Sequence, residues 1–131
     1  MAAARFQIFS VLDRIPVPGG VLANGVATQV GPVTWRFMSA NNRSIGRAAR
    51  DFPDVDTCMS AVRELRRQLP SAICLTVRDG PRHWMWRVRV GGCDHAVSSR
   101  RYERRVQAKN SCDSFLELVD GAAGIDLAEL L

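Results

Sequence analysis

The side chains best suited to acid–base or nucleophilic chemistry are two histidines and one cysteine in the second half of the chain. Cys93 and His95 flank Asp94 in the stretch GGCDHAV, where they could act as two metal ligands or as a nucleophile and its base. Two ligands do not complete a metal site. A neighbouring carboxylate also opposes the lowered thiol pKa that a cysteine nucleophile needs. His83 starts a predicted strand and is not expected to meet His95, so neither a metal nor a catalytic residue is expected.

A cofactor site is not expected either. The glycine-rich stretch PGGVLANGVATQVG lacks the GK[ST] ending of a phosphate-binding Walker loop and does not open a helix. No two carboxylates fall where neighbouring strands would bring them together. The sequence therefore predicts a protein that is not an enzyme and that carries no cofactor.

The four cysteines, at positions 58, 74, 93 and 112, show neither a CxxC pair nor zinc-ligand spacing. The N-terminal stretch MAAARFQIFSVLDR alternates apolar and polar residues and lacks the continuous apolar segment of a secretory signal. No apolar run approaches the roughly 18–20 residues of a membrane helix. These features predict four reduced thiols, a cytoplasmic location and no membrane association.

Arginine dominates the charge of the protein. The net charge is +5, and Lys109 is the only lysine among 18 basic residues. Arginine suits bidentate recognition of phosphate, although a GC-rich genome would produce the same bias. The segment 78–109 holds nine basic and three acidic residues, whereas 110–131 holds five acidic residues and no basic one. A basic block is thus followed by an acidic helix and tail.

The elements that must position these residues occur in the same order twice. RFQIFSV (5–11), VTWRFMS (33–39) and RSIGRAA (43–49) read as strands, and the period then lengthens to that of a helix over 51–69. Asn41-Asn42 and Gly91-Gly92 offer tight turns.

The second unit repeats this order. AICLTV (72–77), HWMWRVRV (83–90) and DHAVSS (94–99) read as strands, with Ile73, Leu75 and Val77 expected on the core side. A helix is expected from about Val106 to Val119, with these residues facing inward: Ala108, Cys112, Phe115 and Val119.

One unit buries too little apolar surface to be stable alone. We therefore expect an α+β fold in which two strand-strand-strand-helix repeats, 1–70 and 71–131, share one antiparallel sheet with both helices on one face. The arrangement would be pseudo-two-fold, a monomer with an internal pseudo-dimer. Residues 12–32 form an insertion with a possible Asn24-Gly25 hairpin, and the tail IDLAELL could add a helical turn.

The repeated stretches resemble a known family. WRFMSANNRSIG with Phe52 in the first unit, and WMWRVRV and AVSSRRY in the second, are similar to the YegP-like repeat, found in small bacterial proteins of uncharacterised role that often hold two tandem copies. The resemblance implies the α+β fold and supplies no reaction. The insertion, Gly92-Cys93 in place of the usual Asn-Gly, and the basic stretch YERRVQAKN depart from the pattern.

Two groups of arginines are candidates for binding. The face of the sheet without helices is expected to present Gln7, Arg36, Met38, Thr76, Met85, Arg87 and Arg89. The start of the second helix carries Arg100, Arg101, Arg104 and Arg105 around Tyr102, where the positive helix end adds to an anion site. The alternative is that the arginines of the second group pair with Asp113, Glu117 and Asp120 or are simply solvated.

The predicted site thus consists of seven arginines: Arg36, Arg87, Arg89, Arg100, Arg101, Arg104 and Arg105. The strand aromatics Trp35, Phe37, Trp84 and Trp86 fall on the other, apolar face, which disfavours base stacking. The sequence predicts a non-catalytic module that binds a protein partner or a small anionic ligand. Sequence-indifferent nucleic-acid binding through the arginines is the alternative.

Overall fold

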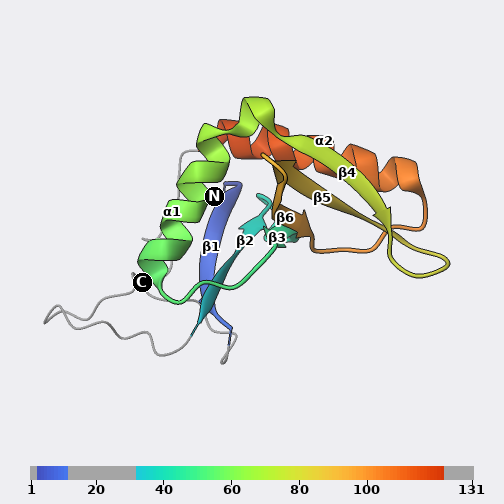
Figure 1. The fold of residues 1–131 in the computed structure, drawn as a ribbon. Coiled ribbons are helices and arrows are strands. Elements are labelled where there is room, and N and C mark those ends of the chain that lie inside the picture. Colours follow the sequence, from blue (N-terminus) through green and yellow to red (C-terminus); the bar gives the residue numbers. More distant parts are fainter. Residues whose placement is uncertain (1–2, 12–31, 123–131) are drawn as a thin grey trace, which may run out of the picture.

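The computed structural model describes residues 3–11 and 32–122 and has an α+β fold. Six antiparallel strands form one sheet in the order β1-β2-β3-β6-β5-β4, and two helices cover one of its faces (Figure 1). The first three strands are Arg5–Ser10, Val33–Met38 and Ser44–Ala48, and the last three are Ile73–Arg78, Trp84–Val90 and Cys93–Ser98. Helix α1 spans Val55–Arg67, a short 3₁₀ turn η1 spans Leu69–Ser71, and helix α2 spans Arg105–Gly121. The expected shared sheet and both expected helices are confirmed.

The two groups of three strands join at the centre of the sheet. There β3 pairs with β6, and Arg47 lies opposite Val97 in this register. The expected tight turns are present, because Asn42 has a φ of 61° and Gly91 and Gly92 have φ values of 58° and 83°. These left-handed conformations suit asparagine and glycine.

A single aromatic core lies between the sheet and the helices. Phe115 of α2 is fully buried, and its ring centroid lies 4.9 Å from that of Trp86, 5.5 Å from that of Phe37 and 6.5 Å from that of Trp35. A Cβ atom at Gly46 would lie 2.7 Å from the Trp86 ring, so only glycine fits there. Because Phe115 touches aromatic residues of both strand groups, the described strands and helices share one core.

Each helix starts beyond a residue that returns to the sheet. Phe52 forms a bridge with Val33, and Tyr102 forms one with Trp84. The Asp54 side chain then accepts a hydrogen bond from Thr57 N and caps α1, which lowers the pKa of Asp54. The inward residues expected for α2 are all buried, as predicted: Ala108, Cys112, Phe115 and Val119.

Strand β4 faces the opposite way from our prediction. Ile73, Leu75 and Val77 lie opposite Arg89, Arg87 and Met85 on the open face, and Ile73 is 58% exposed. Cys74 and Thr76 instead share the helix side with Val88 and Trp86. The expectation that Thr76 belongs to the open face is therefore wrong. The apolar alternation failed because no residue of β4 is fully buried and Cys74 adds an apolar side chain to the helix side, so both faces of this strand are compatible with burial.

Met38 lies on the expected face but is not presented to solvent. Its partner in the unbroken register with β1 is Arg5, which shares a face with Gln7. The side chain is only 7% exposed, so the expectation that the open face presents it is wrong. The register with β3 shifts beside it, between Phe37 and Met38, and simple alternation does not anticipate such a bulge.

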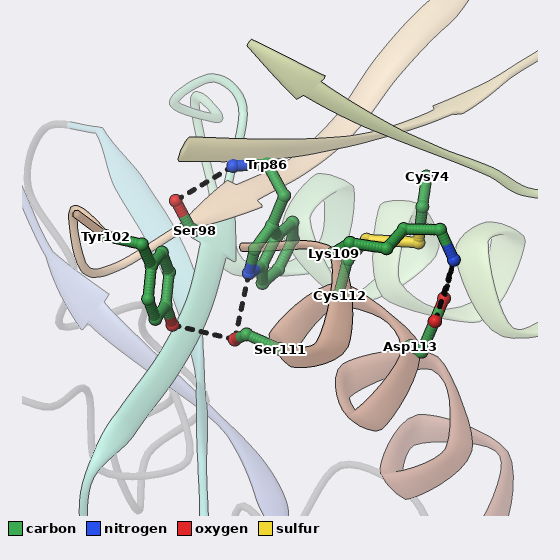
Figure 2. The surroundings of a disulfide bond; sticks show 8 residues. All are labelled: Cys74, Trp86, Ser98, Tyr102, Lys109, Ser111, Cys112 and Asp113. Carbon is green, nitrogen blue, oxygen red and sulfur yellow. Dashed lines mark hydrogen bonds and ion pairs between the residues drawn. A yellow bond between two sulfur atoms is a disulfide. The ribbon is translucent and has the colours of Figure 1, made fainter. Parts of the chain in front are cut away.

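The prediction of four reduced thiols is wrong as well. Cys74 of β4 and Cys112 of α2 form a disulfide, with their Cα atoms 6.1 Å apart (Figure 2). Cys58 is a buried free thiol whose pKa is raised by burial to about 12, and Cys93 is an exposed free thiol. The pairing joins positions 38 residues apart, a proximity that only the folded chain creates.

Among the described helices, none has the length and apolar character to cross a membrane. The expected hairpin at Asn24-Gly25 and the expected helical turn in IDLAELL lie outside the described residues. The division at residue 70 stays a prediction.

Candidate functional site

A cavity of about 580 Å³ opens on the helix-free side of the sheet, and we call it the arginine basin. It is lined by these residues: Arg47, Ala48, Ala49, Arg50, Asp79, Met85, Arg87, Asp94, Val97, Ser98, Ser99, Arg100 and Arg101. Five of them are arginines and two are aspartates, so the lining carries a positive charge.

The central strands build the floor of the basin. Val97 of β6 lies opposite Arg47 of β3 on one side and opposite Arg87 of β5 on the other. Residues paired in this way project from the same face of a sheet, so the two arginines flank a valine. Arg50 follows β3, and Arg100 and Arg101 follow β6, so the two chain segments that leave the sheet toward the helices form the wall.

Two carboxylates neutralise part of this charge. Arg87 Nη1 and Arg89 Nε lie 2.8 and 2.9 Å from the oxygens of Asp94, and Arg101 Nε lies 2.8 Å from Asp79. The hydrogen bonds from Arg89 and Arg87 hold the pKa of Asp94 below its ordinary value. Arg87, Arg89 and Arg101 are therefore already paired with carboxylates.

The other basin arginines have no acidic partner among residues 3–11 and 32–122. Arg47 and Arg100 are exposed, and their side chains make neither a hydrogen bond nor an ion pair with that part of the chain. Arg50 lies over the Phe52 ring, 5.1 Å from its centroid. Guanidinium groups in this state offer donors to an anion without first breaking an existing ion pair.

The structure brings together three of the seven predicted arginines, namely Arg87, Arg100 and Arg101. Arg89 lies beside them and forms an ion pair with Asp94. Arg36 lies elsewhere on the open face, where Nε donates to Gln7 Oε1 at 2.6 Å and burial lowers its pKa.

The remaining two arginines belong to the start of α2. Arg104 precedes the helix, and its backbone N donates to Gln107 Oε1 at 3.1 Å. Arg105 Nε donates to Thr76 Oγ1 at 2.9 Å. Neither lines the basin.

The expected alternative, pairing of the second arginine group with the acidic face of α2, is not seen among the described residues. Asp113 pairs with Lys109 at 2.7 Å, and Arg101 pairs with Asp79. The acidic helix therefore leaves Arg100 available.

Sequence reasoning missed Arg47 and Arg50. Along the strand RSIGRAA, Arg47 alternates with the buried residues Gly46 and Ala48. This alternation could have assigned Arg47 to the open face. Its meeting with Val97 depends on the pairing of β3 with β6, which leaves no local signal.

The residues first considered for catalysis are not brought into the basin. Cys93 and His95 border a separate cavity of about 260 Å³ together with Arg50 and Phe52, and Asp94 beside them is held by two arginines. Within the described ranges, no cluster of three or more His, Cys, Asp or Glu side chains could hold a metal ion. That the protein is not an enzyme stays a prediction from the sequence.

A second polar cluster lies on the helix side and supports the fold. Ser111 Oγ lies 3.1 Å from Trp86 Nε1 and 2.7 Å from Tyr102 Oη, while the Trp86 backbone N donates to Ser98 Oγ (Figure 2). The two hydrogen bonds of Ser111 join α2 to β5 and to Tyr102, which precedes the helix. Every buried polar atom of the described side chains has a partner.

No protein-family model, no curated protein and no solved structure matches the chain. The resemblance to YegP-like repeats therefore rests on the sequence stretches alone.

Proposed function

We propose that the protein is a non-catalytic, YegP-like module of two tandem repeats that binds a small anionic ligand, or an anionic group of a protein partner, in the arginine basin. The symmetric strand order β1-β2-β3-β6-β5-β4 supports the tandem repeat and its pseudo-two-fold arrangement. The matching bridges of Val33 with Phe52 and of Trp84 with Tyr102 support it further.

One observation carries the binding proposal. Arg47 and Arg100 line the same cavity, and neither side chain has an acidic partner in the described ranges. Clustered guanidinium groups repel one another, and an anion that accepts hydrogen bonds from several of them removes that repulsion. Ser99 and the apolar side chains of Met85 and Val97 complete the lining and provide contacts for the uncharged part of a ligand.

Isothermal titration calorimetry with inorganic tripolyphosphate at low salt tests the proposal. Binding should weaken by about tenfold for each arginine removed in the variant Arg47→Gln/Arg100→Gln, since a hydrogen bond to a charged group contributes roughly 1.5–3 kcal/mol. The matched control is Arg43→Gln/Arg63→Gln, which removes the same charge from two exposed positions outside the basin. Equal losses in both double variants would show that only net charge matters, and the basin would not be a site.

The disulfide bears on where the protein works. A bond such as that between Cys74 and Cys112 persists mainly in oxidising compartments and is rare in the reducing cytosol. The cytoplasmic location stays a prediction from the sequence.

A further inference from the structure

A second, smaller cavity adjoins the arginine basin. It measures about 280 Å³ and is lined by Phe9, Val11, Thr34, Asp51 and the segment 47–50. The same four residues of that segment also line the basin. Arg47 and Arg50 therefore stand between two hollows that lie side by side on the open side of the sheet.

The two cavities are built from corresponding positions of the two strand groups. Arg50 stands two residues before Phe52, and Arg100 stands two residues before Tyr102, the residues that form the two bridges. Thr34 follows Val33, the bridge partner of Phe52, and lines the second cavity. Met85 follows Trp84, the bridge partner of Tyr102, and lines the arginine basin. A guanidinium group therefore recurs at equivalent places, which suits a ligand with repeated charges better than a single compact anion.

The second cavity also contains an aromatic ring on the open face. Phe9 lies opposite Thr34 in the sheet and is half-buried, and the Arg36 guanidinium lies over one face of its ring, 5.1 Å from the centroid. The strand aromatics Trp35, Phe37, Trp84 and Trp86 all lie on the helix side of the sheet, whereas Phe9 does not. An aromatic ring beside a row of arginines is the combination by which proteins hold single-stranded nucleic acid.

We infer that the ligand is single-stranded nucleic acid, bound without regard to sequence, with its phosphates along Arg47, Arg50 and Arg100 and a base stacked at Phe9. The inference rests on the proposed function and specifies its ligand class. A duplex keeps its bases stacked inside and cannot offer one to Phe9. A short polyphosphate would satisfy the arginines and leave Phe9 without a role.

Fluorescence anisotropy with labelled oligothymidylates of about 3, 6 and 12 nucleotides tests the inference, because single-strand sites of this kind span roughly 4–16 nucleotides. Affinity should increase by about tenfold from the shortest to the longest probe, and should fall steeply as salt rises. A blunt duplex of the same length and poly-glutamate serve as competing polyanions. If either competitor binds as tightly as the longest oligothymidylate, or more tightly, the inference is wrong. Tighter binding of poly-glutamate would indicate an acidic protein partner.

A paired set of variants separates this inference from the proposed function. Phe9→Leu keeps an apolar side chain but removes the stacking ring, so it should weaken the longest oligothymidylate by about fivefold or more. The same variant should leave tripolyphosphate binding unchanged, and circular dichroism should confirm its fold. If tripolyphosphate binds the basin while oligothymidylates show neither length dependence nor sensitivity to Phe9→Leu, the inference is wrong and the proposed function stands. If no polyanion binds at low salt, both are wrong.

Discussion

The two edges of the sheet are held in place by different means. At one edge, β1 directs Phe6 and Ile8 into the core, where both are fully buried. At the other edge, β4 directs Cys74 and Thr76 toward α2 and leaves Ile73 more than half exposed. Apolar burial holds the first edge strand, whereas a disulfide and the hydrogen bond from Arg105 to Thr76 join the second to its helix. The same strand order therefore accepts two ways of anchoring an edge.

The largest effect should come from breaking the core that the two strand groups share. Phe115→Ala removes the ring that contacts Trp35, Phe37 and Trp86. We expect the free energy of unfolding to fall by about 3–5 kcal/mol. Urea unfolding followed by tryptophan fluorescence measures this, with Phe115→Leu as a milder control. A loss below about 1 kcal/mol would contradict a shared core.

The comparison of the edges can be tested with one substitution at two places. Ile8→Ala opens space in a fully buried site and should cost about 2–5 kcal/mol of unfolding free energy. Ile73→Ala at the exposed edge should change it by about 0.5 kcal/mol or less. Chemical denaturation of both variants measures the two losses of unfolding free energy. Similar losses at the two positions would show that β4 is anchored by burial.

Removing the disulfide should destabilise the whole fold and loosen the β4 edge most. The double variant Cys74→Ala/Cys112→Ala should lose about 2–4 kcal/mol of unfolding free energy, because the cross-link restricts the unfolded chain. Cys93→Ala is the matched control, since this thiol is exposed and unpaired. Amide hydrogen exchange should show a larger loss of protection in β4 than in β1. Unchanged exchange in β4 would mean that its pairing with β5 suffices.

The smallest effect concerns Asp94 on the open face. Its folded-state pKa lies below the ordinary value of 3.8, so its ion pairs stabilise the fold above about pH 4. This contribution is lost as the pH falls through the lowered pKa, and solvent screening keeps it below about 1 kcal/mol. Thermal unfolding of Asp94→Asn should therefore match the parent protein more closely in acid than at neutral pH.

Asp94→Asn should also strengthen anion binding. The substitution removes a negative charge from the basin and releases Arg87 and Arg89. We expect a gain of about threefold or more in tripolyphosphate affinity at neutral pH, measured by calorimetry. Unchanged affinity would show that bound anions do not reach these two arginines.

The local elements could be read from the sequence because each depends on near neighbours. The three-and-four spacing of Cys58, Val62 and Leu65 identified α1, and the same spacing identified α2 with its four inward residues. The alternation of Trp35 and Phe37 placed both on the buried side of β2. Alternation failed at β4, where both sets of side chains contain apolar residues and none is fully buried, so contacts with α2 decide which set faces inward.

The candidate site was only partly accessible to the same reasoning. Arg87, Arg100 and Arg101 stood out by their density in the sequence, whereas Arg104 and Arg105 shared that density and lie outside the basin. Arg47 and Arg50 come from the segment 43–50, which holds three arginines and no acidic residue but was read only as a strand. Density along the chain does not report which face of a sheet an arginine occupies.

The amino-acid sequence alone determined the order of strands and helices and the inward face of each helix, because hydrophobic period is a local property. Long-range pairing decided the rest. The contact of β3 with β6 placed Arg47 beside Val97 and Arg87, and the packing of α2 on β4 brought Cys74 to Cys112. Both results depend on which segments meet in the folded chain. Residues 38 or more positions apart leave no periodic trace of that meeting in the sequence.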